Sequence, residues 1–170
     1  MRKFLLSIIF TFLNLILVSA QQKPLTAYIA ISEECPVCIF MTKTLREIEH
    51  THKDSVTFKL IFPTSLSNYK TISQFKNKYK LTSFESILDS DQSLTKKLNI
   101  TITPEVVLMN YEDSIVYKGR INDAFISPGK SKKSNVTNDL ENAIKLWIEK
   151  KEKFAEWKYA VGCFITFART

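Results

Sequence analysis

Two cysteines three positions apart are the residues of this sequence that most directly suggest chemistry. Cys35 and Cys38 enclose a Pro-Val dipeptide in the stretch SEECPVCIF, directly after a short apolar run. On the first turn of a helix, residues at this spacing share one face and lie within the distance that a disulfide spans. So short a ring removes little loop entropy, which makes a purely stabilising disulfide a poor explanation. We therefore interpret the pair as redox-active thiols.

The position of Cys35 favours the anionic form of its sulfur. Pro36 suits the first position of a helix, which makes Cys35 the N-cap residue. Free backbone N–H groups and the positive end of the helix dipole stabilise a thiolate there, and the thiolate is the nucleophile. Glu33 and Glu34 act in the opposite sense, because nearby negative charge disfavours a second anion. We therefore expect a pKa for Cys35 that is only moderately lowered, and a couple closer to a reductant than to a strong oxidant.

Strand patterns and helix patterns alternate along the sequence that surrounds and follows these cysteines. An apolar, partly β-branched run predicts a strand just before the cysteines, and apolar residues at helical spacing predict a helix from Pro36. Further strands are expected over 56–62, 84–88, 105–111 and 115–121, and further helices over 67–81, 89–98 and 140–148. Only Glu112-Asp113-Ser114 separates the last two strands, which predicts an antiparallel hairpin. The order indicates an α/β fold with a central mixed sheet, a C-terminal antiparallel hairpin and helices on both faces.

The ends of the chain differ in character from its middle. Residues 1–20 combine Arg2 and Lys3, a long apolar run and a small-residue cleavage site, which is typical of a signal peptide; a retained membrane anchor is the alternative. We expect one domain over 21–157 and a tail over 158–170. Export to a periplasm or secretion follows from the leader. The net charge of +7 comes without a basic stripe, so no nucleic-acid partner is expected.

A metal site is an alternative explanation for two nearby cysteines. A zinc finger needs a second ligand pair, and His50 and His52 stand two positions apart instead of the usual three to five. A copper or metallochaperone module could use Cys35, Cys38 and Met41 as soft ligands. We favour a site without metal or organic cofactor and keep the copper module as the less favoured alternative.

A second motif and its context lead to a family resemblance. The stretch TITPEVV places Thr103-Pro104 directly before a strand. A strand, a C-x-x-C, a helix and then a Thr-Pro before a hairpin and a last helix resemble the thioredoxin superfamily. Residues 89–123 are similar to its redoxin branch, which holds exported TlpA-type thiol-disulfide reductases and peroxiredoxins. The resemblance implies a thioredoxin-like fold, Cys35 and Cys38 as catalytic thiols, and a cis peptide at Pro104 whose neighbouring backbone, with Thr103, pairs with substrate.

The sequence departs from that family in two respects. The strand before the cysteines contains no acid, so Glu34 and Glu105 are the candidates for proton transfer to the resolving thiol. A third cysteine, Cys163, follows in AVGCFI. It could be a second resolving thiol, could form an intermolecular disulfide, or could be a buried free thiol.

These observations predict an exported thiol-disulfide oxidoreductase that acts on protein disulfides, most simply as a reductase. Its partners would be disulfide-containing substrate proteins and a membrane-bound thiol electron donor. A peroxiredoxin-like thiol peroxidase is the alternative, because Ser32-x-x-Cys35 matches the peroxidatic pattern of that family. However, Tyr28 replaces its usual proline, and only Arg46 and Arg120 are available to activate a peroxide.

Overall fold

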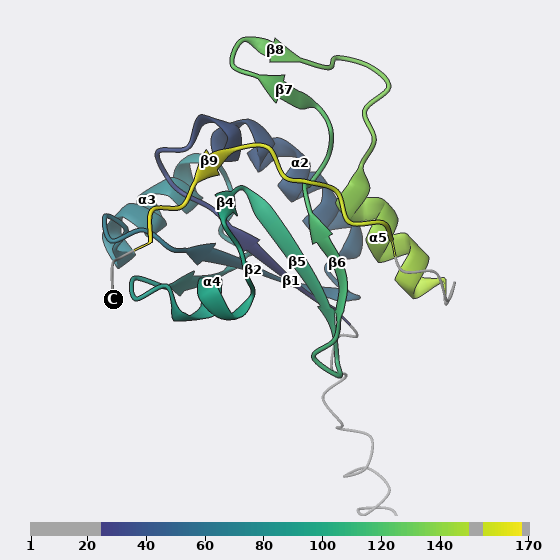
Figure 1. Ribbon diagram of the computed structural model, residues 1–170, viewed down its shortest axis with the longest axis horizontal. Coiled ribbons are helices and arrows are strands. Elements are labelled where there is room, and N and C mark those ends of the chain that lie inside the picture. The colour runs from purple at the N-terminus through teal and green to yellow at the C-terminus, as the bar shows by residue number, and fades with distance from the viewer. Residues whose placement is uncertain (1–24, 150–154, 168–170) are drawn as a thin grey trace, which may run out of the picture.

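A five-stranded mixed sheet forms the centre of the computed structural model, which describes residues 25–149 and 155–167 (Figure 1). The strands lie in the order β3-β2-β1-β5-β6. Strands β1, β2 and β3 are parallel, and β5 runs antiparallel to both β1 and β6. Their bounds are Leu25–Ala30 (β1), Val56–Phe62 (β2), Glu85–Leu88 (β3), Glu105–Asn110 (β5) and Ile115–Gly119 (β6). The predicted mixed sheet and C-terminal hairpin are thus confirmed.

Helices cover both faces of this sheet, as the sequence predicted. Successive side chains of a strand point to opposite faces, so each strand contributes to two cores. The larger core packs against α2 (Pro36–His52), α3 (Tyr69–Lys78) and α5 (Asp139–Ile148). The smaller core includes Leu94 and Leu98, which belong to or directly follow α4 (Ser93–Lys97). Both cysteines of the C-x-x-C lie in the larger core.

Helix α2 begins where the sequence predicted. Pro36 is its first residue, and Cys35 is the N-cap with an extended backbone. Proline is favoured at this position because its missing N–H would have no partner in the helix anyway. Val37, Cys38, Met41, Leu45 and Ile48 are buried at helical spacing and attach the helix to the sheet. Packing against the larger core therefore holds the first turn of α2 in place.

Three short features lie outside the central sheet. Strands β7 (Phe125–Ser127) and β8 (Lys130–Ser131) form a small projecting hairpin, where the sequence predicted only a loop. Strand β4 (Ile102–Thr103) pairs antiparallel with β9 (Cys163–Phe164). The C-terminal segment, which we define as residues 155–167, runs from the side of α5 past β4 toward α3 (Figure 1). It brings the last cysteine back to the middle of the molecule.

The predicted signal peptide, residues 1–20, lies outside the described residues. Among the helices of residues 25–149 and 155–167, none has the length and apolar character needed to cross a membrane.

Candidate active site

The first turn of α2 holds the two cysteines of the C-x-x-C, both nearly inaccessible to solvent. Cys35 is 3% exposed and Cys38 is fully buried. The Sγ of Cys38 accepts a hydrogen bond from the backbone N–H of Ser32 at 3.5 Å. None of the three cysteines forms a disulfide in this structure, so the site is in its dithiol state.

The two thiols have opposite acid strengths. The pKa of Cys35 falls from 9.0 to about 5, chiefly because Cys38 donates a hydrogen bond to its sulfur; burial opposes the shift, and Cys163 and Thr103 assist it. Burial raises the pKa of Cys38 well above its usual value, and the hydrogen bond and charge of Cys35 raise it further. At neutral pH Cys35 is thus a thiolate and Cys38 a thiol. This is the division of roles that a nucleophile and a resolving thiol need.

The pKa of Cys35 is lowered more than the neighbouring acids led us to expect. Glu33 accepts hydrogen bonds from the hydroxyls of Ser67 at 2.7 Å and Thr71 at 2.8 Å. Its carboxylate is therefore held by residues at the start of α3. Neither Glu33 nor Glu34 is among the largest causes of the shift in the pKa of Cys35. The two charges therefore contribute less to the pKa of Cys35 than the sequence-based argument assumed.

The Thr-Pro motif lies directly beside Cys35. The peptide bond between Thr103 and Pro104 is cis, as the resemblance implied. The Sγ of Cys35, when protonated, donates to the carbonyl oxygen of Thr103 at 3.3 Å, across 68 positions of sequence. Thr103 and Pro104 are both buried. The geometry thus joins the two motifs in one site.

The third cysteine reaches the same site through strand β9. Pairing of β9 with β4 sets Cys163 opposite Thr103. Cys163 is also among the groups that lower the pKa of Cys35. Burial raises the pKa of Cys163 to about 11, and the neighbouring sulfur of Cys35 contributes to that rise. The strand that carries Cys163 therefore lies beside the residue whose carbonyl faces Cys35.

Solved structures with the same architecture identify the fold. A hypothetical protein of Sinorhizobium meliloti superposes with a TM-score of 0.73 at 20% identity, over 87% of this chain and 82% of that chain. An uncharacterized conserved protein of Geobacillus kaustophilus gives 0.69 at 16% identity, over 87% and 79%. The thioredoxin domain of a thiol-disulfide oxidoreductase from Bacteroides vulgatus gives 0.54 at 14% identity, over 75% and 81%. No family model and no curated protein matches the sequence.

The chain has the thioredoxin-like fold. The sequence-based prediction of fold class is therefore confirmed. Within this fold, the C-x-x-C stands where β1 leads into α2, and the cis-proline stands where β5 begins.

The two acids predicted to assist proton transfer lie in different surroundings. Glu105 shares the face of β5 with Val107, which belongs to the smaller core, whereas the cysteines lie in the larger core on the other face. Its carboxylate accepts from the N–H of Thr101 at 3.2 Å and lies 4.0 Å from the ammonium of Lys118. Burial raises the pKa of Glu105, which Lys118 partly offsets. Glu105 thus lies on the opposite face of the sheet from the cysteines, and its role in proton transfer stays a prediction. Glu34 is exposed beside Cys35, and its role stays a prediction.

The two arginines proposed to activate a peroxide are engaged elsewhere. Arg46 lies on α2 roughly 16 Å beyond Cys35, at 1.5 Å per residue, and donates to the carbonyl of Tyr79. Arg120 forms an ion pair with Asp139 at 2.7 Å. Met41 is buried in the larger core. Within the described residues, no three His, Cys, Asp or Glu side chains form a group suited to a metal ion.

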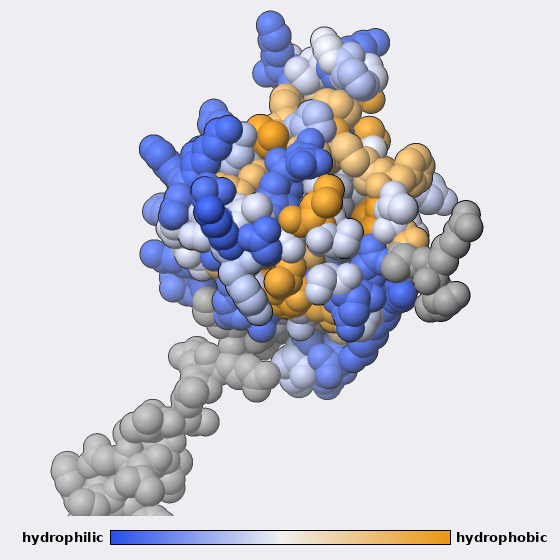
Figure 2. Space-filling model, turned by 90° about the vertical axis from the view of Figure 1, so that its left-hand side faces the viewer, coloured by the Kyte–Doolittle hydropathy of each residue, from blue (hydrophilic) through white to orange (hydrophobic). Residues whose placement is uncertain are grey.

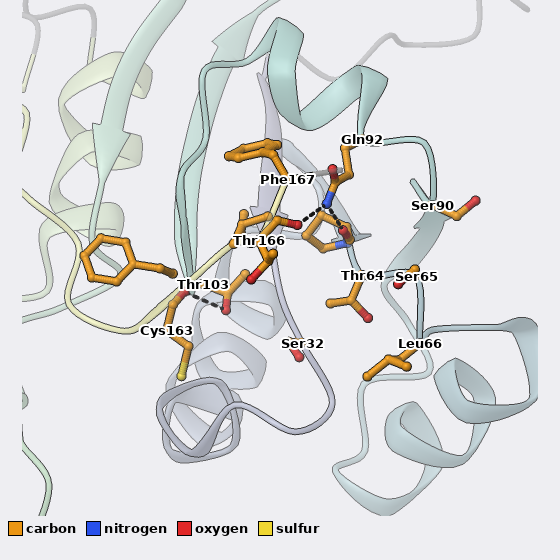
Figure 3. A pocket seen from close by; sticks show the side chains of 13 residues that line it. Ser32, Thr64, Ser65, Leu66, Ser90, Gln92, Thr103, Cys163, Thr166 and Phe167 are labelled. Atoms are coloured by element: carbon orange, nitrogen blue, oxygen red, sulfur yellow. Dashed lines mark hydrogen bonds between the residues drawn. The ribbon is translucent and has the colours of Figure 1, made fainter. Parts of the chain in front are cut away.

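A groove of about 350 Å³ lies beside the site (Figure 3). Its lining includes Ser32, Thr103 and Cys163 on one side, and the loop residues Thr64, Ser65 and Leu66 on the other. Leu66 is 71% exposed and Phe164 is 84% exposed. Figure 2 views the molecule from this side and shows apolar surface framed by hydrophilic side chains. Exposed apolar side chains beside a groove are typical of an interaction site.

One residue that organises this groove was missed from the sequence. The side-chain amide of Gln92 donates to the carbonyls of Pro63 at 2.9 Å and Thr166 at 2.8 Å. It thereby connects the loop after β2 with the C-terminal segment. No local signal marks this glutamine, because its partners are 29 and 74 positions away.

Proposed function

We propose that this chain is an exported thiol-disulfide oxidoreductase that reduces disulfides of other proteins. The observation that carries the proposal is the meeting of Cys35 with Thr103 beside the cis-proline, at 3.3 Å between Sγ and the carbonyl oxygen. The thioredoxin-like fold and the named oxidoreductase among its structural neighbours are consistent with it.

The reaction begins with nucleophilic attack by Cys35. Its lowered pKa keeps the sulfur anionic at neutral pH, so no base is needed to activate it. The thiolate attacks one sulfur of the substrate disulfide, a mixed disulfide forms at Cys35, and the other substrate sulfur leaves as a thiolate. Thr103 and the apolar side chains of the groove are the residues we assign to binding the peptide around the target disulfide.

Cys38 completes the reaction. While Cys35 is an anion, its charge and hydrogen bond help to keep Cys38 protonated. Formation of the mixed disulfide removes that charge, so Cys38 loses its proton more readily. The Cys38 thiolate then attacks the Sγ of Cys35, the reduced substrate leaves, and a Cys35–Cys38 disulfide remains. Two electrons have passed to the substrate, and a thiol donor outside the chain must return them.

Export and an electron donor at the membrane belong to the same proposal. A leader over residues 1–20 would bring the domain into a compartment where protein disulfides persist. A membrane-bound thiol protein is the donor we expect there. The Asn- and Lys-rich surface offers no pattern that points to nucleic acid.

Reduction of insulin by dithiothreitol tests the activity. The chain should accelerate it, and Cys35→Ala should abolish the acceleration while leaving the fold intact by circular dichroism. A wild-type rate equal to that of Cys35→Ala would contradict the proposal. Consumption of hydrogen peroxide with a thiol donor would instead indicate a peroxidase, and copper retained through purification would indicate a metal carrier.

A further inference from the structure

The C-terminal segment pairs with the backbone edge of β4 at the active site. Strand β9 pairs with β4 in the register Ile102 opposite Phe164 and Thr103 opposite Cys163. The N–H of Ile165 extends the pairing by donating to the carbonyl of Thr101 at 3.0 Å. This backbone edge is therefore already occupied by the chain itself, at the residue whose carbonyl faces Cys35.

Several contacts fix this arrangement on both sides of Cys163. The backbone at Gly162 lies so close to β4 that an added Cβ would come within 1.9 Å of the carbonyl oxygen of Thr103. The carbonyl of Lys158 accepts from the N–H of Arg120 at 3.0 Å, and Gln92 holds the carbonyl of Thr166. The position of Cys163 next to Cys35 is thus built into the fold, and it does not depend on the cysteine alone.

The side chain of Cys163 is directed at the dithiol. In Figure 3 its sulfur points away from Gln92 and toward α2. The side chain of Cys163 packs against the larger core, which contains both Cys35 and Cys38. Cys163 lies on an extended strand that pairs with β4 beside the nucleophile Cys35. We expect the target cysteine of a bound substrate to occupy the same kind of position.

We propose that the C-terminal segment is an internal substrate, whose Cys163 exchanges into a disulfide with Cys35. Starting from the Cys35–Cys38 disulfide, the Cys163 thiolate attacks the Sγ of Cys35. The Cys35–Cys163 bond forms, the Cys35–Cys38 bond breaks, and Cys38 leaves as a thiolate that takes up the proton lost by Cys163. No electrons are gained or lost. This inference rests on the proposed function in one respect, namely that Cys35 is the sulfur that takes part in disulfide exchange.

The same exchange gives Cys35 a second resolving partner. When a foreign thiol is bound to Cys35, attack by Cys163 releases it and closes the Cys35–Cys163 disulfide. An extended substrate that pairs with β4 must first displace β9, so the segment also limits access to the site. Replacement of Cys38 alone should therefore fail to trap substrates stably.

Oxidised glutathione tests the exchange in Cys38→Ala, with Cys38→Ala/Cys163→Ser beside it. Cys35 of either variant attacks glutathione disulfide and acquires one glutathione. In Cys38→Ala we expect loss of the adduct and a Cys35–Cys163 crosslink in the peptide mass map. In the double variant the adduct should persist. An adduct equally persistent in both variants, without the crosslink, would overturn the inference.

A matched control moves the thiol by one position. Neighbouring residues of a strand face opposite sides, so Phe164→Cys in the double variant presents a thiol on the same strand but away from Cys35. We expect no crosslink between positions 35 and 164; a crosslink as efficient as that of Cys163 would mean that chain flexibility, and not the register, brings the thiols together. Cys38→Ser repeats the test if Cys38→Ala folds poorly.

The outcome for the wild-type chain separates this inference from the proposed function. If the wild-type chain reduces insulin while Cys38→Ala retains its adduct, the proposed function stands and the internal substrate is wrong. If Cys38→Ala forms the crosslink while the wild-type chain is inactive on insulin, the internal substrate stands and the proposed function is wrong.

Discussion

Cys35 derives its acidity from other sulfurs more than from charged residues. The hydrogen bond from Cys38 is the largest contribution, and the thiol of Cys163 and the hydroxyl of Thr103 add smaller ones. These donors are neutral, so they stabilise the anion without drawing counter-ions into the site. A hydrogen bond to the charged form lowers a pKa by the same principle as a nearby positive charge.

The rate of alkylation of Cys35 by iodoacetamide should report this acidity. In the reduced wild-type chain we expect a midpoint at pH about 5. Cys38→Ala should raise the midpoint most and Cys163→Ser by less, following the order of the two contributions. A wild-type midpoint near the ordinary value of 9.0, or an unchanged midpoint in Cys38→Ala, would contradict this account.

The same shift makes stability depend on pH. The pKa of Cys35 is lower in the folded chain than in the unfolded chain, so the thiolate contributes stability that is fully present above the unfolded value and lost as pH falls toward about 5. The difference in free energy of unfolding between the reduced wild-type chain and Cys35→Ala should therefore shrink between about pH 8 and about pH 5. Denaturant titration at the two pH values measures it, and a difference independent of pH would be the contrary result.

At the scale of elements, the short strands β4 and β9 determine where Cys163 lies. Each contains only two residues, yet their pairing brings Cys163 to Cys35. The close approach at Gly162 is what permits this pairing, because any side chain there would overlap the backbone of Thr103.

Gly162→Ala should accordingly detach β9 from β4. We expect Cys163 of the reduced variant to be alkylated severalfold faster than in the wild-type chain, since its thiol leaves the neighbourhood of Cys35. Val161→Ala, at a residue 43% exposed, is the matched control and should leave the rate nearly unchanged. Equal rates in wild type and Gly162→Ala would show that the contact is not limiting.

Helix α4 depends on one carboxylate before its start. Asp89 accepts hydrogen bonds from the N–H of Leu94 at 3.1 Å and from both the N–H and the hydroxyl of Thr95. Loss of such a cap costs about 1–2 kcal/mol. Asp89→Ala should lower the free energy of unfolding by that amount in urea denaturation. The exposed Asp54→Ala should change it by less than about 0.5 kcal/mol, and similar values for both variants would argue against the cap.

For the whole molecule, the reduction potential of the Cys35–Cys38 couple measures how strongly the site stabilises the thiolate. Stabilising the Cys35 thiolate stabilises the dithiol form, which makes the disulfide more oxidising than that of an unperturbed pair. We expect a potential between the values near −270 mV for thioredoxin and about −120 mV for DsbA. Equilibration with glutathione buffers, read by mass spectrometry, measures it. A value below that of thioredoxin would mean that the thiolate is not stabilised as the geometry implies.

The proposed export can also be tested directly. We expect the chain isolated from outside the cytoplasm to begin near Gln21, by amino-terminal sequencing. An intact amino terminus in a membrane fraction would instead support the retained anchor.

The local features of this protein follow from its sequence alone. The C-x-x-C after a strand, Pro36 at the first position of α2, the aspartate before α4 and the tight hairpin are all settled within a few residues, because short-range backbone geometry and hydrophobic periodicity decide them. The Thr-Pro motif and the resemblance extended this to the thioredoxin-like fold.

Which distant groups lie together depends on the packing of the whole chain. The carboxylate of Glu33 was expected to repel the Cys35 thiolate, but it is bound by the start of α3. The side chain of Glu105 points to the opposite face of the sheet from the cysteines. Cys163 is 128 positions from Cys35, and the pairing of its short strand with β4 places it beside the site, a partner that the local sequence does not specify. Side-chain direction and long-range strand pairing depend on how the whole chain packs, so the local sequence pattern does not predict them.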